Sequence, residues 1–196
     1  MSFGAARTLV VITGASCSGK TTLAEALGRG LSLPVIHRDV LKEALFSTLG
    51  SRDRTWSREW SRTLGGTSYE LLFSVLETLM RAGCSSIVES NFGAGRAADR
   101  LRGLCSRYGF APVEILLTAD LETLRKRYKA RLSSRHAGHV DHVNEATNEA
   151  FWTGERHGTL MLGGRNLRLD TTHFGELEQT ALIDDLKTGL ARQEER

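Results

Sequence analysis

Residues 8 to 28, TLVVITGASCSGKTTLAEALG, contain the pattern that most restricts how this chain can fold. An apolar, β-branched run leads into the loop from Gly14 to Thr21, which reads G-x-x-x-x-G-K-T, and a helical pattern without proline follows. Glycines allow the backbone of such a loop to curl so that successive N–H groups point inward, and the positive end of the helix adds to their field. The succession of strand, loop and helix therefore predicts a binding site for phosphate oxygens.

The lysine and the hydroxyl residue of this pattern have separate tasks. Lys20 is expected to reach the β- and γ-phosphates of a nucleoside triphosphate, and the Thr21 hydroxyl is expected to lie on Mg²⁺. An ordinary glycine-serine turn is the alternative, but a turn does not require a lysine and a hydroxyl at these positions. The expected cofactor-binding residues of this segment are Gly14, Ala15, Ser16, Cys17, Ser18, Gly19, Lys20, Thr21 and Thr22.

Short apolar runs alternate with longer helical patterns along the whole chain. Strands are predicted at 9–13, 34–36, 86–89, 113–118 and 166–169, and helices near 21–31, 39–49, 67–81, 96–108, 121–135 and 176–192. The third helix is expected to open with a capping box, in which Thr67 and Glu70 satisfy backbone N–H groups. This alternation predicts an α/β fold whose parallel sheet is covered by helices on both faces. Ligands of such sheets bind at the carboxyl ends of the strands.

Composition agrees with one domain over residues 1–196. A chain of 196 residues with 40% hydrophobic and 25% charged residues can bury one sizeable core. The net charge of +3 is too small to imply nucleic acid by itself, and the three cysteines form no C-x-x-C pair that would suggest zinc. We expect no secretory signal, because the first predicted strand begins at residue 9, and no apolar run approaches the roughly 18 residues of a membrane span. A cytoplasmic location is therefore expected, with no membrane partner.

Polar residues follow the second and third predicted strands. Asp39 begins the segment HRDVLKEAL, where it could accept a proton from a substrate hydroxyl, hold water on Mg²⁺, or only cap its helix. Lys42 follows one helical turn later and could face substrate or phosphate. Glu89 ends the segment IVE and could orient the water shell of a metal or the attacking group, unless it is simply solvated. Asn91 and Arg96 come next and could line the substrate side.

The segment LRKRYKARLSSRHAGHVDH carries Arg127, Arg131 and Arg135 at intervals of four residues, which places them on one face of the predicted helix. Such a row could close over polyphosphate as a lid at about residues 125–142, or it could be a solvated basic face. Histidines 136, 139 and 142 follow in a predicted loop. Metal binding by them is disfavoured, because no nearby cysteine or carboxylate set completes a tetrahedral pattern.

Residues 51–62, SRDRTWSREWSR, interleave arginines with two tryptophans. Basic and aromatic side chains in this pattern could stack on bases or on a sugar ring. The spacing of the tryptophans fits equally an amphipathic helix that packs its tryptophan face on the core, and we favour this second interpretation. In both cases the segment is expected to border the substrate pocket.

Together these segments resemble the P-loop kinase family that includes bacterial small-molecule kinases of the AAA type, gluconate and chloramphenicol kinases, zeta-type toxins and 5′-hydroxyl polynucleotide kinases. The resemblance covers the phosphate loop, the RDVLK turn, the VESNF strand end, the arginine lid and the last strand LRLDTT. It implies a three-layer fold with a five-stranded parallel sheet, and transfer of the γ-phosphate of ATP to a hydroxyl. The family's general base would match Asp39, also a possible metal ligand, and its lid arginines would match Arg131 and Arg135. Arg127 would lie on the adenine side, and the LDTT loop, Asp170 to Thr172, would lie near adenine, with Thr172 as the expected binding residue.

Two segments indicate the class of acceptor: the RDVLK turn and the arginine lid. Lys42 stands where polynucleotide kinases carry the arginine of Asp-x-x-Arg, and lysine is a point charge rather than a fork, which disfavours a nucleic-acid 3′-phosphate contact. The lid sequence RHAGHVD is closer to the small-molecule members. We therefore expect a small-molecule hydroxyl acceptor. The alternatives are a 5′-hydroxyl polynucleotide or nucleoside kinase and a non-catalytic ATP-binding regulatory module; a GTPase is disfavoured, since neither D-x-x-G nor N-K-x-D occurs.

Overall fold

A computed structural model describes residues 7–49, 58–93, 95–136, 139 and 158–194. Its strands form one sheet in the order β2-β3-β1-β4-β5, and each neighbouring pair is parallel. They are β1 (Thr8–Gly14), β2 (Val35–His37), β3 (Ser86–Glu89), β4 (Ala111–Thr118) and β5 (Arg165–Asp170). The predicted five-stranded parallel sheet is confirmed, and every predicted strand overlaps an observed one.

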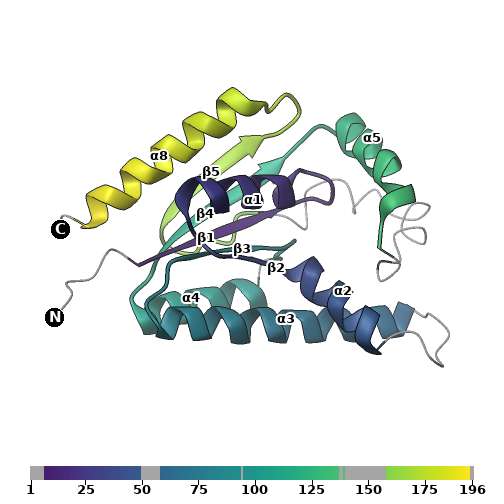
Figure 1. The fold of residues 1–196 in the computed structure, drawn as a ribbon, viewed down its shortest axis with the longest axis horizontal. Helices are drawn as coiled ribbons and strands as arrows, with labels where there is room; N and C mark the ends of the chain where they lie inside the picture. The colour runs from purple at the N-terminus through teal and green to yellow at the C-terminus, as the bar shows by residue number, and fades with distance from the viewer. Residues whose placement is uncertain (1–6, 50–57, 94, 137–138, 140–157, 195–196) are drawn as a thin grey trace.

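Helices cover both faces of the sheet, so the molecule has three layers (Figure 1). On one face lie α1 (Lys20–Leu31) and α8 (Glu176–Glu194), and on the other lie α3 (Arg58–Arg81) and α4 (Arg96–Tyr108). Helix α2 (Arg38–Leu49) packs on α3, whereas α5 (Leu121–Arg131) and the 3-10 turn η1 (Leu132–Ser134) lie beyond the ends of the strands. This arrangement leaves the carboxyl ends of the strands facing α5.

The central strand β1 shows why the first apolar run is continuous. Leu9 and Val11 pack in the core layer of α3 and α4, and Val10 and Ile12 pack in the layer of α1 and α8. All four are at most 1% exposed. Burial of one such side chain contributes about 1.5–3 kcal/mol relative to exposure, so the strand is held from both sides. The loop that follows β1 therefore leaves the sheet from a rigid position.

Helix α3 begins well before residue 67, so the predicted capping box at Thr67 and Glu70 is wrong. Thr67 lies inside the helix, and its hydroxyl donates to the carbonyl oxygen of Thr63 at 3.1 Å. Leu64, only 1% exposed, anchors the earlier turns on the core. Tertiary burial thus overrides the local start signal of the sequence. Of the segment 51–62, residues 51–57 lie outside the described residues, and residues 58–62 are helical.

Helix α5 ends at Arg131, so the prediction of one continuous helix to residue 135 is also wrong. The Ser134 hydroxyl donates to the Arg131 carbonyl oxygen at 3.2 Å, and such a local hydrogen bond competes with continuation of the helix. Arg135 has extended backbone angles, with φ −70° and ψ 133°. The three lid arginines therefore do not share one helix face. In the described part of the chain, no helix has the length and apolar character of a membrane span.

Candidate active site

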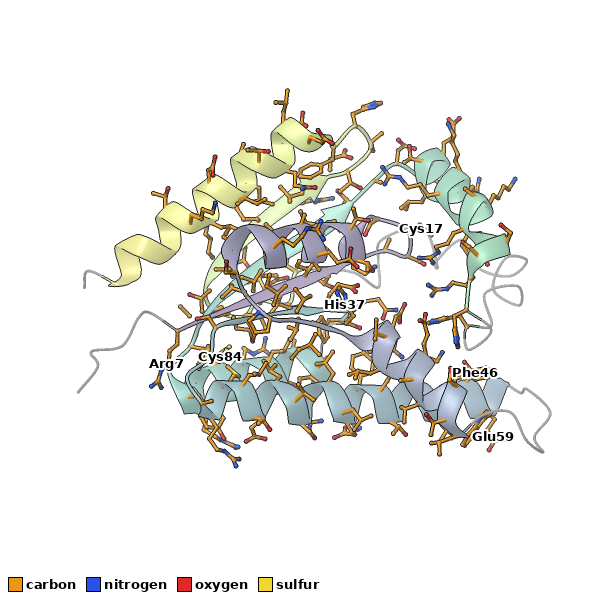
Figure 2. All side chains as sticks on the ribbon, viewed as in Figure 1. Arg7, Cys17, His37, Phe46, Glu59 and Cys84 are labelled. Atoms are coloured by element: carbon orange, nitrogen blue, oxygen red, sulfur yellow. The ribbon has the colours of Figure 1, made fainter. Side chains whose placement is uncertain are left out.

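A cavity of about 710 Å³ lies where the strands end. Glu89 of β3 and Leu117 of β4 line it, together with residues that follow the ends of β1, β2 and β5. Most of the predicted site residues line it: Ser16, Cys17, Gly19, Lys20, Thr21, Thr22, Asp39, Lys42, Glu89, Asn91, Arg127, Arg131 and Arg135. The other predicted site residues are not part of this lining: Gly14, Ala15, Ser18, Arg96 and Thr172. Cys17 and His37 both lie near this end of the sheet (Figure 2).

The loop after β1 needs its two glycines for different reasons. A Cβ atom on Gly14 would lie 2.2 Å from the backbone oxygen of Leu117, so only glycine allows β1 and β4 to approach there. Gly19 has φ 86° in the left-handed region, where it begins α1 without a side-chain cap. The first turn of α1, all of it described, contains no acidic residue. No carboxylate in the first turn therefore offsets the positive end of this helix, which faces the cavity.

Lys20 carries a partly buried positive charge at the floor of the loop. Its ammonium group donates to the carbonyl oxygen of Ala15 at 2.7 Å. Burial lowers the pKa of Lys20, whereas the carboxylates of Glu89 and Asp39 act in the opposite direction. A phosphate group bound here would stabilise the charged form that burial disfavours. The loop, the helix end and this lysine together fit a polyphosphate.

Glu89 lies between two partners rather than in solvent. The Thr21 hydroxyl donates to Glu89 Oε2 at 3.3 Å, and the Nδ1 atom of His37 lies 3.2 Å from the same oxygen. Glu89 is only 4% exposed, which argues against the simple solvated carboxylate considered from the sequence. The hydrogen bond to Glu89 raises the pKa of His37, although burial acts against this. A hydroxyl and a fixed carboxylate are therefore adjacent at the phosphate loop.

Asp39 lies in the first turn of α2, where its negative charge interacts favourably with the positive end of the helix dipole. Its Oδ2 atom accepts a hydrogen bond from Arg135 at 3.3 Å, and its Oδ1 atom lies 3.6 Å from Arg38. Burial favours the neutral acid, but the positive charges of His139 when protonated, of Arg135, of Arg38 and of Lys20 lower the pKa of Asp39 below its usual value. The side chain remains 42% exposed towards the cavity. It is therefore an ionised acceptor within reach of a ligand.

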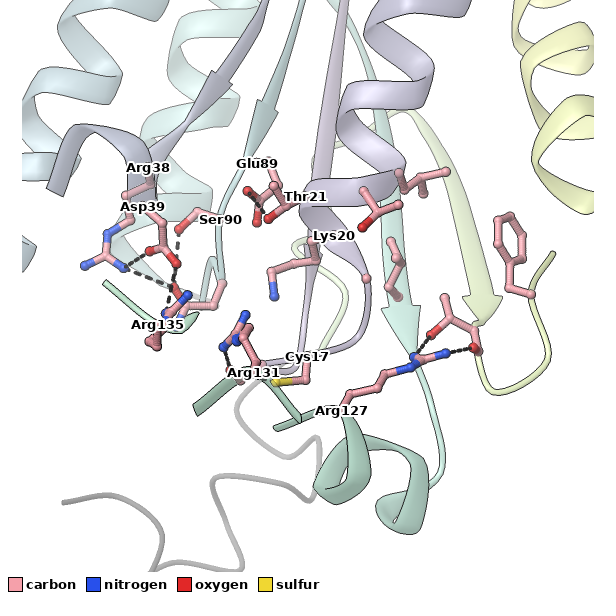
Figure 3. A pocket seen from close by; sticks show the side chains of 18 of the residues that line it. Cys17, Lys20, Thr21, Arg38, Asp39, Glu89, Ser90, Arg127, Arg131 and Arg135 are labelled. Atoms are coloured by element: carbon pink, nitrogen blue, oxygen red, sulfur yellow. Dashed lines mark hydrogen bonds and ion pairs between the residues drawn. The ribbon is translucent and has the colours of Figure 1, made fainter. Parts of the chain in front are cut away.

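The lid arginines contact three different parts of the cavity wall (Figure 3). Arg127 donates to the Thr171 hydroxyl at 3.1 Å and to the Thr171 carbonyl oxygen at 2.6 Å. Arg131 donates to the Ser16 hydroxyl at 3.3 Å, and Arg135 reaches Asp39. The row thus runs from the end of β5, past the phosphate loop, to α2. A solvated basic face would not make these contacts.

Sequence reasoning missed several lining residues, chiefly Arg38, Ser90 and His139 as ligand-facing groups. Arg38 directly precedes the proposed base, so its signal lay within the RDVLK turn already identified. Within the predicted loop from Asp170 to Thr172, the residue that lines the cavity is Thr171, not Thr172. His139 Nε2 lies 2.9 Å from Glu43 Oε1, and burial lowers its pKa. Within the described residues, no three His, Cys, Asp or Glu side chains are grouped as a metal site; His142 lies outside them.

Thr171 closes the wall beside the phosphate loop. Its hydroxyl donates to the backbone oxygens of Ser18 and Thr118, each at 3.0 Å, and it is only 4% exposed. Thr172 instead accepts a hydrogen bond from the backbone N–H of Asp120 at 3.0 Å, outside the cavity lining. The loop after β5 therefore contributes to the cavity through Thr171.

Comparison with known proteins agrees with this geometry. The AAA domain family matches residues 9–152. A candidate kinase from Chloroflexus aurantiacus has 34% sequence identity and a TM-score of 0.83, over 93% of this chain and 97% of the other. Among curated proteins, none is detectably similar in sequence to this chain.

Two more distant structures share the fold. An APS kinase from Mycobacterium tuberculosis, solved with AMPPNP and APS, is 19% identical with a TM-score of 0.62, over 94% of this chain and 99% of the other. A gluconokinase from Sinorhizobium meliloti 1021 is 16% identical with a TM-score of 0.53, over 96% of this chain and 94% of the other. The chain therefore belongs to the AAA domain family and has a P-loop kinase-type fold.

Proposed function

We propose that this protein is a kinase that transfers the γ-phosphate of ATP to a hydroxyl group of a small molecule. One observation carries the proposal: a single cavity is lined by the phosphate-loop lysine Lys20, by the ionised carboxylate of Asp39 and by the lid arginines Arg131 and Arg135. Phosphoryl transfer requires positioning and charge neutralisation more than covalent chemistry by the protein. These groups would provide both the positioning and the charge neutralisation within one cavity.

The proposed cofactors are ATP and Mg²⁺. The backbone of residues 14–20 would hold the phosphates, and the partly buried Lys20 charge would be neutralised by them. Mg²⁺ prefers oxygen ligands, and the Thr21 hydroxyl with the adjacent Glu89 carboxylate offers them, while Asp39 is a further candidate ligand. When bound, Mg²⁺ would neutralise charge on the phosphate oxygens.

The transfer step assigns distinct tasks to the residues of this chain. Asp39, ionised at neutral pH because its pKa is lowered, would orient the acceptor hydroxyl and take its proton as the bond to phosphorus forms. Lys20, Arg131 and Arg135 would hold the transferred group in line and stabilise its negative charge. Closing the lid would also exclude water as a competing acceptor.

The nucleoside would lie at the opposite end of the cavity from Asp39. Arg127 and Thr171 are joined there, and Phe174 adds an aromatic ring to the lining. The acceptor would lie beside Asp39, with Lys42 and Asn91 nearby. Arg96, which does not line the cavity, has no task in this proposal. We propose that residues 1–196 form one kinase domain.

The test is acceptor-dependent ADP formation. The full chain, with ATP and Mg²⁺, would be incubated with hydroxyl compounds that include sugars, sugar acids, nucleosides and 5′-hydroxyl oligonucleotides. The proposal expects ADP release that depends on a small-molecule acceptor and a phosphorylated product detectable by mass spectrometry. Preferred transfer to oligonucleotides would favour the polynucleotide alternative. Tight ATP binding with no acceptor-dependent ADP would favour the non-catalytic module.

A further inference from the structure

One buried side chain after β5 contacts both the phosphate loop and the end of the sheet. Thr171 is only 4% exposed, and its hydroxyl donates to the backbone oxygen of Ser18 at 3.0 Å. The same hydroxyl lies 3.0 Å from the Thr118 oxygen, which already accepts the backbone N–H of Thr171 at 2.7 Å. The Thr171 hydroxyl is therefore a direct connection between the phosphate loop and the loop after β5.

The same residue also binds a lid arginine. Arg127 of α5 donates through Nη1 to the Thr171 hydroxyl at 3.1 Å and through Nη2 to the Thr171 carbonyl oxygen at 2.6 Å (Figure 3). A planar guanidinium with two hydrogen bonds to one residue is fixed in orientation as well as in position. Because the Thr171 hydroxyl accepts from Arg127 and donates to Ser18, the lid helix and the phosphate loop share one oxygen atom.

The start of α5 is attached to the same loop after β5. Asp120 caps the helix by accepting a hydrogen bond from the Thr123 backbone N–H at 2.7 Å, and its own N–H donates to the Thr172 hydroxyl at 3.0 Å. Asp120 and Arg127 are seven residues apart, which is about two helical turns. Two attachment points at this spacing fix the direction of the helix axis. Arg131 lies one further turn along the same helix.

Apolar packing also joins α5 to the phosphate loop. Leu124 and Tyr128 are each 2% exposed, and both pack with Ala15. Such contacts hold two elements together but have no preferred direction. Arg131 meets the loop at Ser16, where its hydrogen bond of 3.3 Å is longer than the usual range, so a small shift of the helix would break it. Apolar packing therefore leaves the exact placement of Arg131 to the directional contacts after β5.

We propose that Thr171 is a positioning residue for phosphoryl transfer: its hydroxyl couples α5 to the phosphate loop and so places Arg131 against the bound phosphates. The inference rests on the proposed kinase function and adds to it a residue that acts through another. Without the hydroxyl, Arg127 and the Ser18 oxygen lose their shared partner, and Arg131 is present but misplaced. A misplacement of about 1 Å caused by a remote change can cost about 10²-fold in rate.

Binding of inorganic tripolyphosphate with Mg²⁺ tests the coupling without a transfer step. Calorimetry would compare wild type, Arg131→Ala, Thr171→Val and the double variant. We expect Arg131→Ala to weaken binding about tenfold in the wild-type background, the loss expected for one charge-assisted hydrogen bond. It should weaken binding less than about threefold when Thr171→Val is already present, because coupled residues are not additive. Thr171→Ser keeps the hydroxyl and should restore the full effect of Arg131→Ala.

Thr118→Val is the matched control. It removes another threonine hydroxyl, which donates to the Leu169 carbonyl oxygen at 3.3 Å, and Thr118 does not line the cavity. Arg131→Ala should keep its tenfold effect in this background. A merely structural Thr171 would lower stability and leave the effect of Arg131→Ala unchanged. Equal effects of Arg131→Ala in wild type and in folded Thr171→Val protein, no effect in either included, would overturn the inference.

Arg127→Gln replaces Thr171→Val if the latter does not fold, because Arg127 is partly exposed and its loss leaves Thr171 in place. The inference expects Arg131→Ala to have a smaller effect on tripolyphosphate binding in this background too. Two arginines that acted independently on one polyphosphate would compete for its charge, so removing Arg127 would leave the effect of Arg131→Ala equal or larger. Such a result would contradict the proposed coupling.

Steady-state kinetics with an acceptor identified by the ADP assay form the second arm. Thr171→Val should lower kcat by about 10² with little change in the KM of the acceptor, and adding Arg131→Ala should lower kcat by less than about threefold more. Additive losses would overturn the inference and leave the kinase function intact. Coupled binding of tripolyphosphate without transfer to any acceptor would support the coupling and count against the kinase function.

Discussion

Arg135 lies 3.3 Å from Asp39 through its Nη2 atom, although the two residues are 96 positions apart in the sequence. The contact joins the segment after α5 to the first turn of α2. With the contacts of Arg127 and Arg131 it ties the lid to three walls of the cavity. The proposed base and a proposed transition-state arginine are thus positioned by each other, and single substitutions can separate their tasks.

Lys20→Ala should abolish ATP turnover and leave the fold intact. The ammonium is partly buried at the phosphate loop and lines the cavity, and desolvation there lowers its pKa, so we expect it to serve a ligand rather than the core. Turnover would be measured as ADP formation and folding as the thermal unfolding midpoint. Lys126→Ala, which removes an exposed lysine of α5, is the control and should turn over ATP like wild type. Normal turnover in folded Lys20→Ala protein would contradict the assignment of the loop.

Arg131→Ala and Arg135→Ala should each lower kcat by about 10² or more while weakening ATP binding less, because the contact is strongest in the transition state. Steady-state kinetics and equilibrium titration of an ATP analogue would measure the two effects. Arg125→Ala removes an exposed arginine of α5, the helix that ends at Arg131, and serves as the control. If both lid variants kept wild-type kcat, the arginines would have only a structural role.

Asp39→Asn should separate catalysis from stability. Asparagine keeps the shape of the side chain, so the free energy of unfolding should change by less than about 1 kcal/mol, the usual size of a helix-dipole contribution. Asparagine cannot take the proton of the acceptor hydroxyl, so transfer should fall by about 10² to 10⁴. Calorimetry with ATP and Mg²⁺ would distinguish a general base from a metal ligand. Preserved affinity agrees with a general base, whereas lost affinity would make Asp39 a metal ligand.

His37 should make stability depend on pH. Its hydrogen bond to Glu89 raises its pKa above the ordinary value despite burial, so folding favours the protonated form. The stabilisation is then complete below the unfolded pKa of about 6.5 and is lost as pH rises through the raised folded pKa. Urea unfolding at several pH values should therefore show His37→Gln to be most destabilising, relative to wild type, at the acidic end of this range.

The control for this pH effect is His173→Gln, because His173 is exposed. Its unfolding free energy should follow that of wild type at every pH. A constant difference between His37→Gln and wild type from acid to alkaline pH would mean that the imidazole contributes through packing and not through its charge.

Local sequence was sufficient to predict the phosphate loop, because its strand, glycines, lysine and helix start are contiguous and each conformation is set by nearby residues. Local sequence also sufficed to predict that Asp39 and Glu89 lie at the ends of strands. The sheet class and the layers followed from the alternation of apolar runs. The family resemblance added the pairing of the lid with the loop. These are properties that neighbouring residues determine.

Only the tertiary structure decided which distant residues meet. His37 and Glu89 share a face because β2 and β3 are adjacent in register, and this depends on strand order. Arg38 stacks on Tyr69 because α2 packs on α3, two helices whose contact is not encoded in either local sequence. The Ser134 hydrogen bond ended α5 early, yet Arg135 still reaches the cavity. Such pairings depend on packing between elements far apart in sequence, which periodicity and spacing do not encode.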